Sequence, residues 1–220
     1  NIWIGTDNGM SMLSGLSFYS YTPLADITQS GDGNCLHNIY RDSRGTMWMG
    51  GTDGLLRYDN YNGIYANMSW FRQNSSKTPL SHNRIRSIYE DADGVRWVAT
   101  DHGINWYDRK SGLFRNFIIS DKTGRYSTAW AYDLVLDSRK RLWIAAYMGG
   151  VFVIDKRRLL YSHGTVIADH HISDGKGKLL NIHVGQLNLD AKGNIWALVY
   201  GSGMACINPV NFKVRTVMPQ

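Results

Sequence analysis

A tryptophan-centred phrase recurs along the chain at a nearly constant period, and this recurrence limits the possible folds more than any other feature. Trp3, Trp48, Trp97, Trp143 and Trp196 are separated by 45, 49, 46 and 53 residues. An aspartate stands six residues before each of the last four tryptophans, at Asp42, Asp91, Asp137 and Asp190. Self-similarity with a period of about 40 to 50 residues predicts an array of repeated supersecondary units.

Each repeat has the pattern of four short antiparallel strands. A strand is predicted before each aspartate, at residues 38–40, 85–89, 131–136 and 186–189. The Asp-x-x-Gly segment predicts a tight turn, because the Asp side chain caps it and glycine accepts a positive φ. The tryptophan strand and a third strand follow, and a fourth is predicted at 18–21, 70–72 and 114–117. Four such strands in about 45 residues are one β-propeller blade.

The predicted fold is all-β, with about five four-stranded antiparallel propeller blades. A sandwich or barrel does not explain the self-similarity, a β-solenoid repeats over fewer residues, and no segment has a sustained helical period. The approximate blades are 1–37, which lacks its first strand, then 38–84, 85–130, 131–184 and 185–220. We therefore expect a fragment of a larger seven-bladed or double propeller.

Composition excludes several protein classes. With 43% hydrophobic and 19% charged residues among 220, the chain is not of the disordered type. We expect no membrane span, because no stretch approaches about 20 apolar residues, and no signal peptide. Cys35 and Cys206, 171 positions apart, allow at most one disulfide and leave the redox compartment open. The net charge of +6 favours anionic partners without naming one.

The consensus phrase D-x-x-G-x-[LIM]-W-[IVM]-[GA]-T-x-x-G-[LI]-x-x-Y-D resembles the two-component regulator propeller repeat, and the resemblance extends over essentially the whole chain. That family forms the periplasmic sensor region of hybrid two-component systems in gut Bacteroides-type bacteria. In the family, two seven-bladed propellers precede a β-sandwich, a membrane helix and a cytoplasmic histidine kinase with receiver and DNA-binding regions. The fourth repeat departs from the phrase at Arg139 and Lys140 and at residues 145–147, and the fifth at Leu198 and Val199.

The resemblance implies a non-enzymatic periplasmic sensor of oligosaccharides, in an inner-membrane-anchored protein that controls a polysaccharide-utilisation response. The implied partners are an oligosaccharide, neutral or acidic, the remaining blades and β-sandwich of the same protein, and a second copy in a homodimer. We expect no cofactor, no metal and no nucleic acid.

The repeated residues are predicted to be structural and not part of a binding site. A tryptophan that recurs at one strand position packs between blades. The Asp-x-Asp-Gly at residues 91–94 resembles the start of a calcium loop, but the later ligands of such a loop are missing. The sister turns lack the second aspartate, so we interpret this segment as turn chemistry.

The candidate binding residues lie in two sets of loops predicted to share one face: the turns between second and third strands, and the connections between blades. Propeller loops vary in sequence on a rigid scaffold and so carry function. Aromatic rings stack on the apolar face of a pyranose, polar groups bind its hydroxyls, and Arg binds a carboxylate or sulfate. The predicted ligand-binding residues are Trp130, Tyr147, Tyr200, His102, Arg125, Asp101 and Arg84. The same loops contain Asp53, Arg72, His82, Tyr126, Lys176, Lys178 and His183.

Two alternatives stay open. A propeller enzyme of the streptogramin-lyase type needs a His/Glu cluster, for which His82, His102 and His183 are candidates, but Glu90, the only glutamate, precedes a turn on the other face. A protein-interaction scaffold could use the basic triplets 139–141 and 156–158, which we predict lie in hairpin turns and form one patch on that face. Without interleaved aromatic residues, the patch is not typical of a nucleic-acid site.

Overall fold

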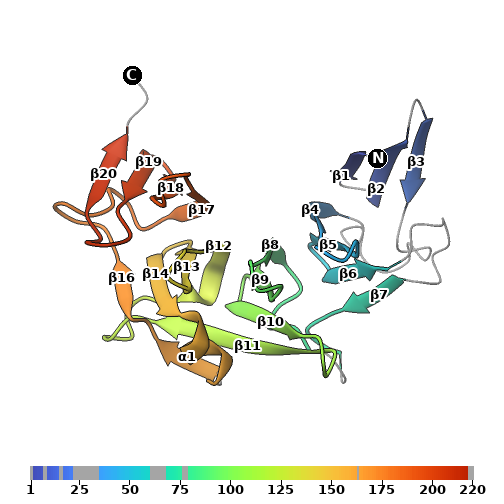
Figure 1. Ribbon diagram of the computed structural model, residues 1–220, viewed down its shortest axis with the longest axis horizontal. Helices are drawn as coiled ribbons and strands as arrows, with labels where there is room; N and C mark the ends of the chain where they lie inside the picture. The colour runs from blue at the N-terminus through green and yellow to red at the C-terminus, as the bar shows by residue number, and fades with distance from the viewer. Residues whose placement is uncertain are drawn as a thin grey trace.

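A computed structural model describes residues 2–6, 9–14, 17–21, 35–59, 68–75, 79–162 and 164–217. The described strands form five sheets, each built mainly from consecutive antiparallel strands. Figure 1 shows these sheets side by side in an open arc, with the first and fifth sheets at its two ends. The chain therefore forms β-propeller blades, as the repeat predicts, and the described sheets do not close into a ring.

The first two sheets contain the strands of the N-terminal third of the chain. The first holds β1 (Ile2–Thr6), β2 (Gly9–Ser14) and β3 (Ser17–Tyr21). The second holds β4 (Leu36–Arg41), β5 (Met47–Gly51), β6 (Leu55–Tyr58) and β7 (Met68–Phe71).

The remaining three sheets follow the same order. The third holds β8 (Ile85–Glu90), β9 (Arg96–Thr100), β10 (Ile104–Asp108) and β11 (Leu113–Ser120). The fourth holds β12 (Ala131–Leu136), β13 (Arg141–Ala146), β14 (Gly150–Asp155) and β16 (His170–Ile172). The fifth holds β17 (Val184–Leu189), β18 (Ile195–Val199), β19 (Gly203–Ile207) and β20 (Val214–Val217).

In Figure 1 the first strands of the sheets line the inner side of the arc and the last strands lie outside. Side chains join these inner strands to one another. The Oγ of Ser87 donates to Asp133 Oδ1 at 2.6 Å, and the backbone N–H of Leu187 donates to Asp133 Oδ2 at 2.9 Å. Asp133 therefore connects the third, fourth and fifth sheets. Burial raises the pKa of the Asp133 carboxyl, although the hydrogen bonds that it accepts act to lower this pKa.

The aspartate of each repeat has two bonding roles, both local in sequence. Its Oδ1 accepts backbone N–H groups two and four residues later, as at Asp91 from Asp93 (2.9 Å) and Val95 (3.1 Å), which forms the turn. Its Oδ2 accepts the indole N–H of the repeat tryptophan. These donors are Trp48, Trp97, Trp143 and Trp196, at 2.9 to 3.0 Å. The turn prediction is confirmed, and the same carboxylate also fixes the tryptophan ring.

The turn glycines explain one departure from the consensus. Gly45, Gly94 and Gly193 have φ of 88°, 75° and 83°, in the left-handed region that glycine adopts without steric cost. Lys140 occupies the same place in the fourth repeat and has φ of 61°. A lysine there is strained relative to glycine. Its side chain provides a compensating contact, because Nζ lies 2.7 Å from Asp93 Oδ1 in the third sheet.

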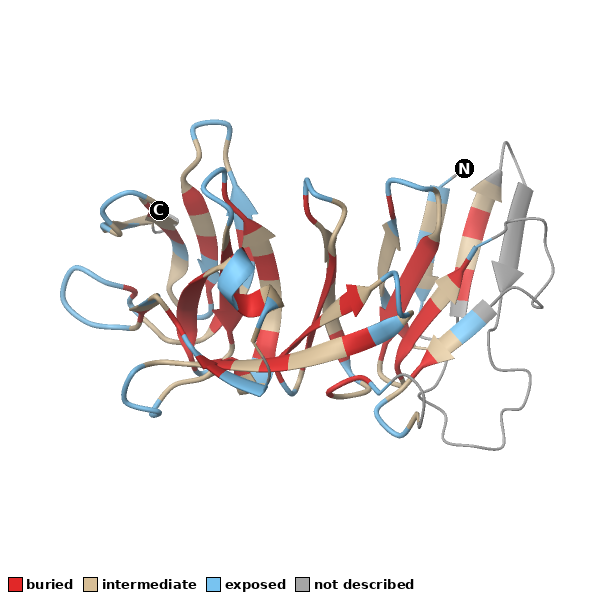
Figure 2. Ribbon diagram, turned by 60° about the horizontal axis from the view of Figure 1, so that its bottom comes forward, coloured by how far each residue is buried: buried red, intermediate tan, exposed pale blue. Residues whose placement is uncertain are grey.

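The hydrophobic cores lie between adjacent sheets. One core joins Trp48 and Phe71 of the second sheet to Val98, Tyr107 and Phe114 of the third. The next joins residues of the third and fourth sheets around Trp97 and Phe152, and another joins the fourth and fifth. Figure 2 shows the buried positions concentrated in the strands, with the exposed ones mostly in the turns. The repeat tryptophans Trp48, Trp97 and Trp143 are buried, so their predicted packing between blades is confirmed.

The fourth repeat contains an insertion that the sequence pattern does not predict. Between β14 and β16, the short helix α1 (Lys156–Leu160) is followed by β15 (Gly164–Ile167), which pairs in parallel with β11 of the third sheet. A segment within residues 131–184 thus adds a fifth strand to the preceding blade. Val166 is buried in the core of the third and fourth sheets, whereas Ile167 is 50% exposed.

The prediction for the basic patch is wrong for one of its two turns. Residues 156–158 lie in α1 and not in a hairpin turn, because Asp155 caps the helix by accepting the N–H groups of Arg157 and Arg158. Most cations of the two triplets are also paired. Lys156 contacts Asp91 and Asp93, and the remaining pairs are Lys140–Asp93, Arg141–Asp137, Arg157–Asp155 and Arg158–Asp169.

Neither Cys35, just before β4, nor Cys206, in β19, forms a disulfide in the described part of the chain. No helix among the described residues is long and apolar enough to cross a membrane.

Candidate functional site

An aromatic cluster forms around Tyr147 in the turn after β13. Its ring centroid lies 5.9 Å from that of Trp130, 5.1 Å from Tyr132, 4.7 Å from His183 and 5.7 Å from Tyr200. Tyr132 stacks with an interplanar angle of 14°, whereas His183 and Tyr200 meet the ring edge-on at 64° and 78°. We call these five residues the Tyr147 cluster. They come from the fourth and fifth blades and the connections that lead into them.

Backbone hydrogen bonds hold the cluster to the preceding connection. The N–H of Tyr147 donates to the carbonyl of Trp130 at 2.9 Å, and the N–H of Tyr200 donates to that of His183 at 2.9 Å. Each turn between second and third strands is therefore tied to the connection before its own blade. This pairing places both loop sets on one face, which we call the mouth face.

β-Bulges in two of the inner strands, β8 and β12, each add one side chain to this region. The pairing register of the inner strands shifts between Ile85 and Ser87 in β8 and between Ala131 and Asp133 in β12. The extra residues are Arg86 and Tyr132. A bulge re-aims the side chain of its extra residue, and both of these are directed to the Tyr147 cluster.

The corresponding bulge in β17 carries no side chain. Its extra residue is Gly185, between Val184 and Gln186, and a Cβ there would lie 2.5 Å from Cε2 of Tyr200. The ring of Tyr200 therefore packs directly on the backbone, and any larger residue at this position requires that ring to shift.

Arg86 connects the cluster to an acidic group. Its guanidinium forms a two-point ion pair with Asp101, at 2.5 Å from Nε and 2.9 Å from Nη2, and its Cζ lies 4.3 Å from the centroid of Tyr132. Arg84 lies 4.0 Å from the same carboxylate. Burial of Arg86 opposes its charge, but the hydrogen bonds that it donates to Asp101, with the negative charge of that carboxylate, outweigh burial and raise the pKa of the guanidinium. Burial, with the nearby negative charge of Asp101, raises the pKa of the Tyr132 hydroxyl, so this ring stays neutral.

The outer surface of the cluster is exposed and amphipathic. Trp130 is 45% exposed and Tyr200 46%, and Met148 and Leu198 next to them are also exposed. Ring faces, tyrosine hydroxyls and a fixed Arg–Asp pair offer stacking surfaces beside hydrogen-bond donors and acceptors. That combination fits a sugar ring with its hydroxyl groups.

The structure groups five of the seven predicted residues and separates two. Trp130, Tyr147 and Tyr200 belong to the cluster, and Asp101 and Arg84 adjoin it through Arg86.

His102 and Arg125 lie elsewhere. His102 lines a separate cavity of about 330 Å³ with Gln73, Asn116 and Thr165. Arg125 is exposed, and its Cζ lies 5.2 Å from the ring centroid of Tyr126, which in turn packs on His171. Both residues are in the predicted loops, but membership of these loops does not determine the distance of a side chain from the inner strands.

Sequence reasoning missed Arg86 and Tyr132. Both lie in predicted strands, where the search for loop residues did not extend. A β-bulge is difficult to detect from the sequence of a single short strand. The repeat does contain a signal, because Arg86, Tyr132 and Gly185 occupy the same place in three repeats and differ strongly in type.

The groups needed for the enzyme alternative are engaged or dispersed. Glu90 accepts bonds from the N–H and Oγ of Ser43 at 2.7 and 3.0 Å and pairs with Arg96 at 3.4 Å. His82 accepts the N–H of Arg84, whereas His183 contacts Asn181 and Tyr147. Among the described residues, no group of three or more His, Cys, Asp or Glu side chains could hold a metal ion.

Comparison with known proteins identifies the repeat. Residues 79–102 match the family described as two-component regulator propeller. The extracellular domain of BT4673 from B. thetaiotaomicron, described as a one-component system, has a TM-score of 0.81 at 35% identity. That similarity covers 98% of this chain and 30% of the other. The chain contains two-component regulator propeller repeats.

Two further solved structures are similar to the chain, one in sequence and structure and the other in fold alone. A second structure of the BT4673 extracellular domain, described as a hybrid two-component system, has a TM-score of 0.80 at 31% identity and covers 98% of this chain and 36% of that one. This regulator propeller therefore spans about a third of the length of those domains. Virginiamycin B lyase from Staphylococcus aureus shares the fold alone, with a TM-score of 0.68 at 13% identity over 99% of this chain and 66% of the lyase. No curated protein matches the sequence.

Proposed function

We propose that the chain is part of the periplasmic, ligand-sensing region of a two-component signalling protein and that its Tyr147 cluster binds an oligosaccharide. The sensor role is supported by the similarity to extracellular domains of two-component systems. The observation that carries the ligand class is the set of exposed aromatic faces beside the Arg86–Asp101 pair on one face of the blades.

The cluster suits neutral sugars better than strongly acidic ones. Asp101 already occupies the fork of Arg86, so an acidic sugar has to compete with a carboxylate that is in place. Hydroxyl groups can instead bond to the free lone pairs and N–H groups of this pair. Trp130 and Tyr200 then supply the stacking surfaces.

Signalling requires that the ligand bind one arrangement of the protein more tightly than another. Tyr147 contacts residues from both the fourth and fifth blades, so a ligand on this ring contacts both blades at once. In this proposal, occupancy changes the relative position of these blades, and the rest of the protein passes that change to a kinase and a polysaccharide-utilisation response.

The experiment is calorimetric titration of the protein with a panel of neutral and acidic oligosaccharides. The variants are Trp130→Ala and Tyr147→Ala, and the matched control is Tyr161→Ala, because Tyr161 is 87% exposed and lies at the end of α1. We expect selective binding that each cluster variant weakens at least about fivefold, since stacking contacts of this kind contribute roughly 1 kcal/mol or more. The control should bind as the parent does. Equal affinity of the parent and Tyr147→Ala for every sugar that binds would contradict the proposal.

A further inference from the structure

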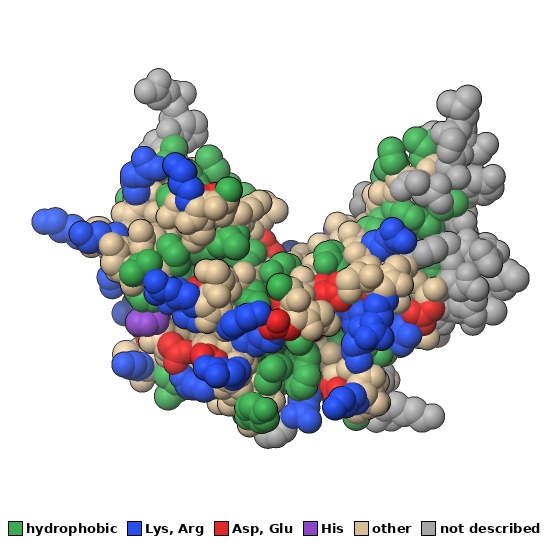
Figure 3. Space-filling model, viewed as in Figure 1, with side chains coloured by type: hydrophobic (Ala, Val, Ile, Leu, Met, Phe, Trp, Pro, Cys, Tyr) green, Lys and Arg blue, Asp and Glu red, His purple; other side chains and the backbone are tan. Residues whose placement is uncertain are grey.

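A second candidate site lies on the opposite face, between the second and third sheets. It is a cavity of about 520 Å³ whose walls include Arg44, Arg57, Arg96, Arg109 and Lys110. Of the described residues that line it, Asp42 alone is acidic. The cavity adjoins the Asp turns, whereas the Tyr147 cluster lies at the other ends of the strands. In Figure 3 Lys and Arg side chains gather near β6 on the visible face.

Most of this positive charge is not balanced inside the cavity. Asp42 is already bonded to Arg96 and to the indole N–H of Trp48, and Arg57 pairs with Asp59 at 2.7 Å. Among the described residues, no carboxylate forms an ion pair with Arg44, Arg109 or Lys110. These three exposed cations therefore remain available to an outside anion.

The cations also act on each other. Burial, followed by the positive charges of Arg96 and Arg44, lowers the pKa of the Arg109 guanidinium. Like charges are thus held close enough to oppose one another, which costs stability when the cavity is empty. An anion placed among them removes that repulsion.

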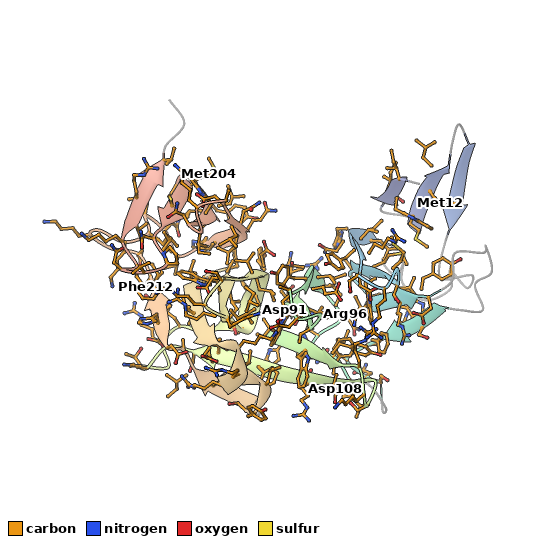
Figure 4. All side chains as sticks on the ribbon, viewed as in Figure 1. Met12, Asp91, Arg96, Asp108, Met204 and Phe212 are labelled. Atoms are coloured by element: carbon orange, nitrogen blue, oxygen red, sulfur yellow. The ribbon has the colours of Figure 1, made fainter. Side chains whose placement is uncertain are left out.

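Arg96 provides an independent observation. Its side chain is 2% exposed, and one amino group bonds to Asp42 and Glu90, but its Nε has no hydrogen-bond partner among the described residues. Buried N–H groups without partners are rare because each costs free energy. Figure 4 labels Arg96 near the centre of the arc, at the start of β9.

A rigid aromatic wall completes the cavity. The guanidinium carbons of Arg57 and Arg96 lie 5.9 and 5.5 Å from the ring centroid of Trp48. Nη1 of Arg57 donates to the hydroxyl of Tyr107 at 3.2 Å. These contacts restrain the orientation of both guanidinium groups, so the positive charge that they contribute to the cavity wall is fixed in place.

We propose that this cavity is a binding site for a tetrahedral oxyanion, sulfate or phosphate, separate from the Tyr147 cluster. Arg44, Arg109 and Lys110 bind the anion directly, while Arg96 supplies positive charge from the buried wall. The cavity is larger than one such anion, so it also has room for part of a molecule that carries a sulfate or phosphate ester.

The test is calorimetric titration of the purified protein with sodium sulfate, sodium phosphate and a sulfated monosaccharide, with ionic strength held constant by sodium chloride. The variant is the triple substitution Arg44→Ala, Arg109→Ala and Lys110→Ala. The matched control replaces three exposed cations of other blades, in Arg139→Ala, Lys192→Ala and Lys213→Ala. Both triple variants lower the net charge equally, and neither removes a side-chain bond of the described structure.

We expect saturable binding of at least one of these ligands, weakened more than about tenfold in the cavity variant, because charge-assisted hydrogen bonds are the strong ones. The control should change the affinity less than about threefold, as expected for a general charge effect. Tighter binding of the sulfated sugar than of both inorganic anions would assign the source to an ester, and the reverse to a free anion. Equal weakening in the two triple variants, or no saturable binding by the parent, overturns the proposal. Neither result bears on the sugar titration at the Tyr147 cluster, where Tyr147→Ala should leave anion binding unchanged.

Discussion

The ammonium group of Lys156 lies 2.6 Å from Oδ2 of Asp91, the same carboxylate oxygen that accepts the indole N–H of Trp97. Lys156 comes from the fourth blade and Asp91 from the third, and both are buried. The Asp93 carboxylate lies 2.8 Å from the same ammonium. The two aspartates that resemble the start of a calcium loop therefore enclose a lysine, and the charge of this turn is balanced by a residue of the neighbouring blade.

Lys156→Met should destabilise the protein strongly. The substitution leaves Asp91 buried without its cation, and removal of one partner of a buried ion pair costs about 3 to 5 kcal/mol. Urea unfolding at neutral pH, followed by tryptophan fluorescence, measures the change. Lys140→Ala is the control, because Lys140 contacts the same turn through Asp93 but is half exposed, and it should have a much smaller effect. Comparable losses in the two variants would show that the buried contact has no special role.

Asp42→Asn should alter the dependence of stability on pH. Burial tends to raise the pKa of Asp42, but the bond from Trp48 and the charge of Arg96 outweigh it, so the pKa is lowered. A carboxyl with a lowered folded-state pKa stabilises the protein above its ordinary pKa of about 3.9, and this contribution is lost as the pH falls further. The unfolding free energy of the parent should therefore exceed that of the variant by roughly 3 kcal/mol or more near pH 7. The difference should narrow below about pH 4.

Urea midpoints of parent and Asp42→Asn between neutral pH and pH 2.5 measure this convergence. A constant difference over the whole range would mean that the charge of Asp42 does not carry its contribution to stability.

Arg86 and Asp101 should show energetic coupling. The two-point ion pair is partly buried, with side-chain exposures of 27% and 16%. In a double-mutant cycle of Arg86→Ala and Asp101→Ala, we expect a coupling energy of roughly 0.5 to 3 kcal/mol in unfolding free energy. The cycle of Arg86→Ala with Lys213→Ala, in the fifth sheet, should be additive. If the effects of Arg86→Ala and Asp101→Ala on the unfolding free energy were additive, the ion pair between these residues would not contribute to stability.

Val166→Asp should detach β15 from the third sheet, whereas Ile167→Asp should not. Adjacent strand residues point to opposite sides, so Val166 enters the core while Ile167 stays half exposed. A buried unpaired carboxylate is strongly unfavourable. Hydrogen exchange should show faster exchange in β11 and β15 for Val166→Asp and near-parental rates for Ile167→Asp. If both variants kept full protection from hydrogen exchange in β11 and β15, the pairing of β15 with the third sheet would be contradicted.

Sequence alone was sufficient to predict the blades, because the interactions that define each blade are local in sequence. The turn at Asp91 and the bond from Asp91 to Trp97 span six residues, and the same spacing recurs in four repeats. The period identifies which residues are structural, and on that basis the tryptophans and aspartates were left out of the search for a site. The mouth face followed from the antiparallel order of the four strands, which puts the second turn of a blade and the connection between blades on one face, and this is why Trp130, Tyr147 and Tyr200 were predicted together.

Only the tertiary structure decided the contacts between blades. The separation of Lys156 from Asp91 is 65 residues, and β15 joins a sheet whose other strands precede its own blade. Arg86 and Tyr132 reach the cluster through a one-residue register shift that depends on the partner strand. The cationic cavity likewise needs Arg44 of one blade and Arg109 of the next. Such contacts depend on the packing of neighbouring sheets, and no local spacing in the sequence encodes that geometry.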